Sequence, residues 1–200
     1  AQTSADFAAI QTAADSALQL LDNYALSVRL QLAPQTFEVE PVSVSSVLYD
    51  AGQRLNALAC SYGVDLELSI AGRYEPVMAH RAGLEAALVS LGTSLIEALP
   101  AQGDTQLKLQ LATHRCRYGI VAGLYTDDPK LSLQNLAIGR GLQAAASRQP
   151  LPALTHTAGA GIFVADTLLS AMKLKLTASR HHRLYGRGAV LPPSNQLQLV

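Results

Sequence analysis

One segment in the last quarter of the chain constrains the fold more than any other: a glycine-containing loop that passes into an apolar helix and then into a strand. Residues 154–176 begin with Thr, His, Ala and Gly and end in alternating Lys and Leu. Between them, apolar residues recur three and four positions apart, the spacing of a helix with one buried face: Ile162, Ala165, Leu168, Leu169 and Met172. Residues 173–177 alternate with the period of a strand. The segment therefore predicts loop, helix and strand in direct succession.

Two glycines, Gly159 and Gly161, stand where this helix begins. Backbone N–H groups left bare there, together with the positive end of the helix dipole, could face an anion such as a phosphate. Small residues at a helix start also let the helix pack closely on its neighbours. The pattern alone leaves both interpretations open.

The N-terminal residues 3–32 have a helical pattern with heptad character. A helix of about 28 residues would be about 42 Å long, which exceeds the average helix of a globular protein. Its apolar stripe consists of Phe7, Ile10, Ala14, Ala17, Leu21, Tyr24 and Val28. The stripe could pair with the same helix of a second copy or pack on the chain's own domain, and the sequence favours neither.

The rest of the chain alternates helical and strand patterns. Residues 35–40 predict a short edge strand, and Ser43 caps a helix that Gly63 ends. Strands follow at 64–70 and 77–79, a helix at 83–99, and a hairpin whose strands contain 107–111 and 120–124. Residues 133–147 predict a helix, 148–157 a connection, and 187–191 and 196–200 the final strands. This order predicts an α+β fold, a two-layer sandwich whose mixed sheet is covered by helices on one face.

Composition excludes several functional classes. The 200 residues are 49% hydrophobic and 15% charged, and 15 basic residues balance 15 acidic ones, so we expect no nucleic-acid partner. No apolar run approaches the roughly 20 residues of a spanning helix, so we expect no membrane partner. Cys60 and Cys116 lie in a helix and a strand pattern and predict two buried thiols in a reducing cytoplasm, not a disulfide or metal site.

The order of elements resembles the ATPase domain of sensor histidine kinases, a fold shared with the GHKL ATPases. Residues 20–27 resemble the second dimerisation helix of those kinases, and 42–63 the first helix of their ATPase domain. Residues 161–172 resemble the helix after the last glycine box, and 186–192 the closing strands. The resemblance implies a dimerisation-type helix in residues 1–33, an ATPase-like domain in residues 34–200, and a homodimer through the N-terminal helix.

The nucleotide-binding boxes of that family depart from their pattern here. Its two N-box asparagines fall on Ser90 and Ser94, and the second is the family's Mg²⁺ ligand. A serine hydroxyl lacks the carbonyl oxygen that suits a hard cation, so we expect no bound metal. Glu97, one helical turn further on, could substitute for it or simply face solvent.

The adenine-binding Asp of the family falls on Thr126, and two of its glycines fall on Asp128 and Lys130. Asp127 is adjacent, but a one-residue step along a strand points to the opposite face. The last glycine box, which begins at Thr157, keeps Gly159 and Gly161. We therefore expect a vestigial nucleotide pocket with lost or weak ATP binding.

No residue is predicted to be catalytic. The five histidines lie outside any phosphoacceptor motif; His181 and His182, between Arg180 and Arg183, predict a basic hairpin tip. The resemblance implies a cytoplasmic, pseudokinase-like binding or adaptor module of bacterial-type two-component signalling. Its expected partners are a second copy and a response-regulator receiver domain or a histidine kinase. The alternatives are an active ATP- and Mg²⁺-dependent histidine kinase or phosphotransferase with a variant site, and a purely structural dimer module.

Overall fold

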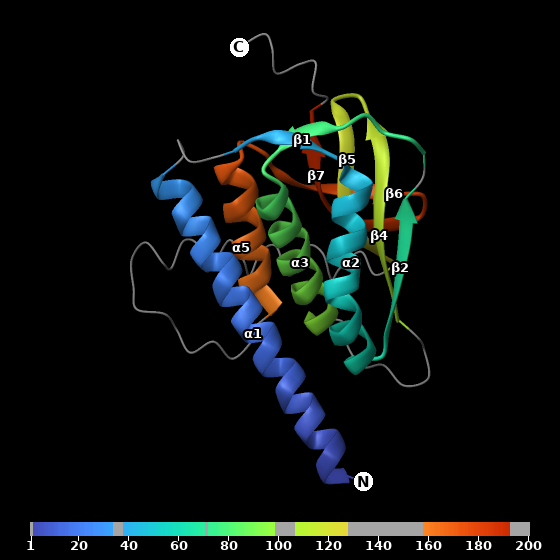
Figure 1. Ribbon diagram of the computed structural model, residues 1–200. Helices are drawn as coiled ribbons and strands as arrows, with labels where there is room; N and C mark the ends of the chain where they lie inside the picture. The colour runs from blue at the N-terminus through green and yellow to red at the C-terminus, as the bar shows by residue number, and fades with distance from the viewer. Residues whose placement is uncertain (1, 34–37, 71, 99–106, 128–157, 193–200) are drawn as a thin grey trace.

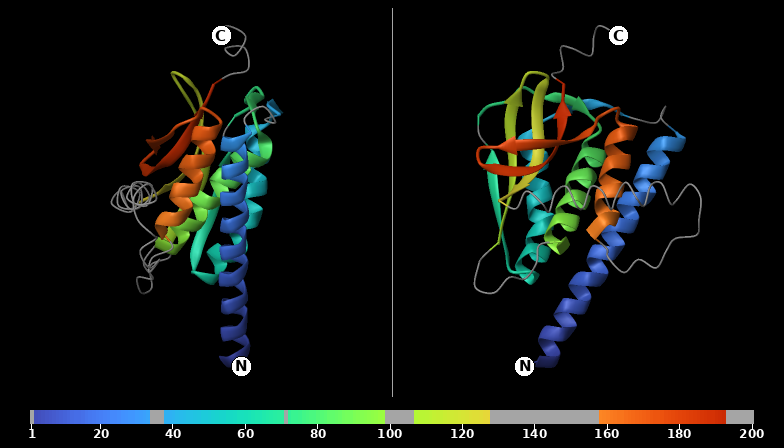
Figure 2. Two further views of the ribbon diagram at one scale, coloured as in Figure 1. Left: turned by 90° about the vertical axis from the view of Figure 1, so that its left-hand side faces the viewer. Right: turned by 180° about the vertical axis from the view of Figure 1, so that it is seen from behind.

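The computed structural model describes residues 2–33, 38–70, 72–98, 107–127 and 158–192. These residues form two layers, with the helices on one face of a twisted sheet (Figures 1 and 2). The helices α2 (Val44–Ser61), α3 (Arg81–Ala98) and α5 (Ala158–Ala171) lie on the sheet. The helix α1 (Gln2–Leu32) runs beside α5 and extends past the domain at its N-terminal end (Figure 1). The predicted two-layer sandwich and the long N-terminal helix are confirmed.

The main sheet has five strands in the order β2-β4-β5-β7-β6. The strands are β2 (Val64–Ile70), β4 (Leu107–Cys116), β5 (Gly119–Thr126), β7 (Leu184–Leu191) and β6 (Leu176–His181). β2 pairs with β4 in parallel, and every other pair is antiparallel, so the sheet is mixed as predicted. A separate two-stranded sheet pairs β1 (Glu40–Val42) with β3 (Val77–Ala79).

The central helix α3 is the most buried of the helices on the sheet. From Gly83 to Ile96 its side chains are buried, apart from that of Glu85, because α1, α2, α5 and the sheet surround it. A helix that is apolar all round belongs in an interior. α2, in contrast, buries one stripe and exposes the other, and Ser43 caps it by accepting from the Ser46 N–H, as predicted.

The sheet coils strongly between β5 and β7. A side chain at Gly186 would collide with the Leu124 carbonyl, and one at Gly123 with the Arg187 carbonyl, so the two strands cross more closely than side chains would allow. Seen from behind, the β6–β7 hairpin runs across the direction of the other strands (Figure 2, right), although β6 forms the edge of the same hydrogen-bonded sheet beyond β7. The glycines therefore set the curvature that brings this hairpin back over the sheet.

Three local predictions need correction. Of the strand predicted at 35–40, residues 35–37 lie outside the described residues and 38–39 are not in a strand; the strand occupies Glu40–Val42, where it pairs with Val77–Ala79. β6 begins at Leu176, after the left-handed turn at Lys173 (φ 58°) has ended α5. Cys60 is exposed, since its position on α2 faces solvent; both cysteines are free.

Other predictions lie outside the described residues: the helix at 133–147, the connection at 148–157 and the strand at 196–200. In the described part of the chain, no helix is both long and apolar enough to cross a bilayer.

Candidate functional site

Several residues of the predicted nucleotide pocket lie where the start of α5 meets the middle of α3. The backbone N–H of Ile162 donates to the Ser94 hydroxyl over 3.1 Å, and this contact is buried. Ile162 is the fifth residue of α5, so its N–H lies just past the first-turn donors that could hold an anion. The contact instead joins this turn of α5 to Ser94 of α3.

Gly161 brings the two helices into direct contact. A methyl group on it would overlap the carbonyl oxygen of Ser90 and would lie 2.6 Å from the Ser94 hydroxyl oxygen. Close approach of two helix backbones is one of the few situations that require glycine. The sequence left open whether these glycines bind an anion or allow close packing, and the structure gives Gly161 a packing role. Gly159 is also buried.

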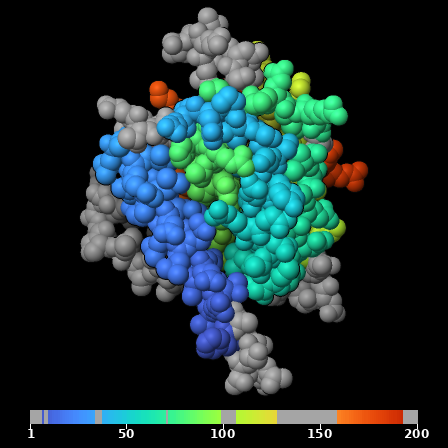
Figure 3. Space-filling view, in the orientation of Figure 1, coloured from blue at the N-terminus to red at the C-terminus, as the bar shows by residue number. Residues whose placement is uncertain are grey.

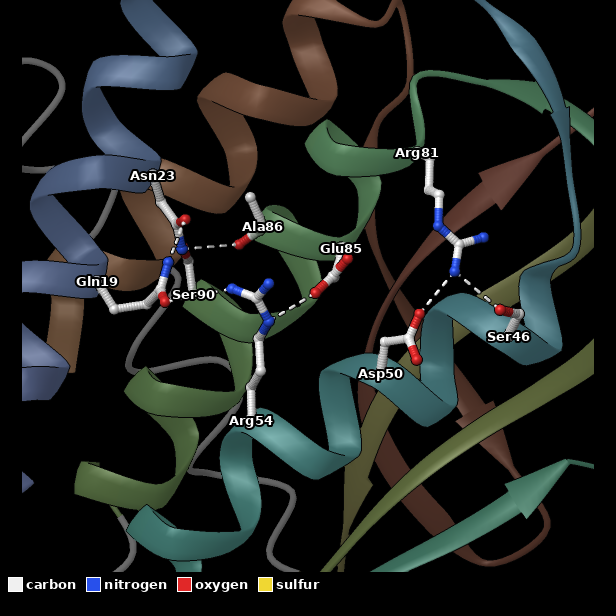
Figure 4. Close-up of polar contacts among 9 residues, drawn as sticks. All are labelled: Gln19, Asn23, Ser46, Asp50, Arg54, Arg81, Glu85, Ala86 and Ser90. Carbon is white, nitrogen blue, oxygen red and sulfur yellow. Dashed lines mark hydrogen bonds and ion pairs between the residues drawn. The ribbon is translucent and has the colours of Figure 1, made fainter.

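Ser90, at the first N-box position, faces α1. Its hydroxyl accepts from the side-chain amide of Asn23 over 2.9 Å, and the same amide donates to the Ala86 carbonyl over 3.3 Å (Figure 4). Gln19, one turn earlier, donates to the Asn23 amide oxygen over 3.0 Å. Asn23 is only 4% exposed, so these bonds are shielded from water. The long helix is therefore tied to the N-box helix by a buried polar contact.

Apolar contacts extend this attachment. Leu30 is buried in the main core, while Leu20 and Leu26 are half-buried against it. The Tyr24 and Phe163 rings lie 6.3 Å apart, centroid to centroid, between α1 and α5. The C-terminal half of α1 thus packs on its own domain.

The predicted dimer stripe lies mainly on another face of α1. Phe7, Ile10 and Leu21 are 73%, 67% and 63% exposed. Ala14 and Ala17 are exposed as well, Tyr24 is 45% exposed, and Val28 is half-buried. The sequence left open whether α1 packs on its own domain or on a second copy, and the structure gives each alternative a different face of the helix. One face of α1 packs on the domain, and most of the stripe on the other face is exposed in the described part of the chain.

A shallow groove separates α1 from α2, with α3 as its floor (Figure 3). Arg54 of α2 crosses it and forms an ion pair with Glu85 of α3 over 2.7 Å (Figure 4). Arg81, at the start of α3, contacts Asp50 over 2.6 Å and Ser46 over 2.8 Å on α2. The groove is thus crossed by the Arg54–Glu85 ion pair, with Asn23 and Gln19 lining its other side, and Arg81 adds a second link between α2 and α3 outside the groove.

The other predicted site residues that the structure describes lie at the ends of β5 and α3. Thr126 is buried at the end of β5 and donates to the Asp127 carboxylate over 3.3 Å, while Asp127 is exposed. Glu97 is half-buried near the end of α3. The pKa of Tyr62 is raised, first by the burial of Tyr62 and second by the charge of Glu97. Asp128 and Thr157 lie outside the described residues.

Among the described residues, no three His, Cys, Asp or Glu side chains are grouped in a way that could hold a metal ion. Asn23 is the residue whose role the sequence analysis missed. The signal in the sequence was a pair of polar residues, Asn23 and Ser27, on the side of the helix away from the apolar stripe. In the structure both side chains are buried.

No protein-family model and no curated protein matches the chain in sequence. Solved structures match it in shape. Acinetobacter baumannii histidine kinase AdeS is 12% identical, with a TM-score of 0.60 over 93% of this chain and 83% of that one. The catalytic domain of histidine kinase ThkA is 11% identical, with a TM-score of 0.56 over 80% and 98%.

Full-length ShkA, solved in complex with AMPPNP, is 16% identical with a TM-score of 0.57; the match covers 96% of this chain but only 38% of ShkA. At such identities the likeness concerns the fold. This chain has the fold of a histidine-kinase-like ATPase domain, as the resemblance implied.

Proposed function

We propose that this chain is a binding or adaptor module of two-component-type signalling that has lost ATP binding or keeps it only weakly. The observation that carries the proposal is the direct contact between α3 and the start of α5, where a methyl group on Gly161 would overlap the Ser90 carbonyl oxygen. A phosphate bound between these helices would have to push them apart and break the Ile162 N–H bond to Ser94.

The chemistry of the neighbouring positions supports the same conclusion. Ser94 offers no carbonyl oxygen for Mg²⁺, and its hydroxyl already accepts a hydrogen bond. Thr126, at the adenine-reading position, is buried and bonded to Asp127. Without metal and base contacts, a triphosphate has little to offset the cost of desolvation and ordering.

The attachment of α1 supports a binding role. A kinase must let its ATPase domain move to reach an acceptor histidine, whereas the Asn23–Ser90 contact holds α1 against the domain. The exposed stripe around Phe7, Ile10 and Leu21 offers a surface for a second copy. A receiver domain or a histidine kinase is the partner class that we propose for the assembled module.

Isothermal titration of the whole chain with ATP and ADP, each with and without Mg²⁺, tests the proposal. We expect no binding tighter than about 1 mM, which corresponds to about −4 kcal/mol. Tighter, Mg²⁺-dependent binding would favour the alternative, an active kinase or phosphotransferase with a variant site. Titrating Ser94→Ala in parallel shows whether any nucleotide that binds does so at the α3–α5 junction. Binding there should change when this hydroxyl is removed.

The partner side of the proposal needs a separate experiment. Purified receiver domains, immobilised with and without phosphoryl analogue, are offered to the chain, and a helical protein of similar charge serves as the control. Specific retention by receivers supports the adaptor; binding to none of them, together with a self-associated state in sedimentation, supports a structural dimer module instead.

A further inference from the structure

The tip of the β6–β7 hairpin, residues 181–184, lies against the outer face of the sheet, the face away from the helices. In hydrogen-bonding order β6 is separated from β4 by β5 and β7. Even so, the ring of His181 on β6 stacks on the ring of His114 on β4, with the centroids 5.4 Å apart. The coil at Gly186 and Gly123 thus brings the tip back over strands that it does not pair with (Figure 2, right).

Where the tip meets the sheet there is a small aromatic cluster, which we define as His181 and His182 of the tip together with His114 and Tyr125 of the strands below. The Tyr125 ring lies 5.4 Å from that of His181 and 5.9 Å from that of His114. His182, the turn residue with φ 53°, places its ring 4.4 Å from that of His181. The packing under the tip therefore depends largely on three imidazoles.

Few polar contacts accompany this packing. The Tyr125 hydroxyl lies 2.8 Å from the Ser179 hydroxyl and 3.4 Å from His114 Nδ1. His181 is 5% exposed, and its Nε2 is buried without a hydrogen-bond partner among the described residues. A second proton on this ring would bring a charge into a site that has no acceptor for it.

The charges around the cluster do not favour protonation. Burial lowers the pKa of both His114 and His181, and the nearby His182 lowers both further; His114 adds to the effect on His181. Among the other packed groups, burial raises the pKa of Tyr125, so its phenol is neutral near pH 7. Arg180 bonds to the Tyr185 hydroxyl over 2.6 Å, Arg183 is exposed in the turn, and the Asp127 carboxylate accepts from Thr126.

We propose that this cluster is a pH-sensitive latch: neutral imidazoles hold the β6–β7 hairpin tip on the sheet, and their protonation in mild acid releases it. The device is independent of the proposed adaptor function, because it lies on the opposite face of the sheet from α3 and α5.

The direction and size of the effect follow from linkage. In the open state each histidine has a pKa of about 6.5. When closing lowers that pKa, the neutral histidine contributes its full stabilisation of the closed tip above about pH 6.5. This stabilisation is lost as the pH falls from there toward the lowered pKa. In that window the opening constant of the tip rises by up to about tenfold per pH unit for each of the two imidazoles, His114 and His181.

Nuclear magnetic resonance of the whole chain tests the latch. Long-range ¹⁵N–¹H spectra of the imidazoles, recorded from pH 8 to pH 5, give each pKa, with His80 on the helix side as an internal reference. We expect His114 and His181 to titrate below about 6.5. We also expect the amide signals of β6 and β7 to change in step with them, while those of α2 stay constant.

The variant His114→Phe with His181→Phe keeps two rings in the cluster but removes their protons. In it the hairpin amides become independent of pH over this range, and His182→Gln, which leaves the imidazoles of His114 and His181 in place, retains the response. Imidazoles that titrate at or above 6.5, or hairpin amides that do not change while they titrate, overturn the proposal. Should the double variant fail to fold, the wild-type titration alone decides.

Discussion

Replacement of Asn23 by Ala tests whether α1 is held to the domain by a polar contact. The side-chain amide donates two buried hydrogen bonds, to Ser90 Oγ and to the Ala86 carbonyl. Each is worth about 0.5–1.5 kcal/mol, so we expect a loss of about 2 kcal/mol in the free energy of unfolding. The exposed Asn56 on α2 provides a matched control: Asn56→Ala should change stability by less than about 0.5 kcal/mol.

A double-mutant cycle isolates the Asn23–Ser90 pair from the other effects of truncation. Ser90→Ala and Asn23→Ala are measured singly and together by urea unfolding, followed by circular dichroism. The expected coupling is about 1 kcal/mol, because the pair makes one direct bond. Hydrogen exchange of the α1 amides accompanies these measurements, since α1 could detach before the domain unfolds.

Two results would refute this reasoning. Equal losses for Asn23→Ala and Asn56→Ala would mean that the contact to α3 contributes nothing, and a coupling near zero would mean that the two side chains do not interact in solution. Either outcome would also weaken the adaptor proposal, which depends on a fixed α1.

Three further predictions concern other parts of the molecule. Gly161→Ala should cost about 1–3 kcal/mol in urea unfolding, since its methyl group overlaps the Ser90 carbonyl; unchanged stability would mean a looser α3–α5 junction. Burial raises the pKa of Tyr125 to about 12, so stability that is complete below pH 10 should fall between pH 10 and 12, by at most about 2.7 kcal/mol. Ultraviolet titration of the seven tyrosines should find one late phenolate that is missing from Tyr125→Phe. Leu21→Asp, at a side chain that is 63% exposed, should shift sedimentation toward a monomer without loss of helicity; an unchanged dimer would place the interface elsewhere.

Local patterns were enough to predict most of the elements. The stripe of α2, its Ser43 cap and the strands β2 and β4 each depend on neighbours within a few residues, and the structure confirms these elements. The burial of β2 does not follow the predicted alternation, since Leu68 is exposed. The layered arrangement followed from the order of these elements, because a helix with one apolar face has to cover a sheet. Ser90 and Ser94 were placed at the N-box positions by the resemblance to histidine kinase ATPase domains.

What those serines contact was decided only by the tertiary structure. Ser90 meets a side chain 67 positions earlier and Ser94 a backbone N–H 68 positions later, and no periodicity carries such distant information. For the same reason, the sequence could not say whether Gly161 left room for a phosphate or for a helix. Nor could it place His114 beneath His181, because that contact needs the coil of a sheet in which two other strands lie between them.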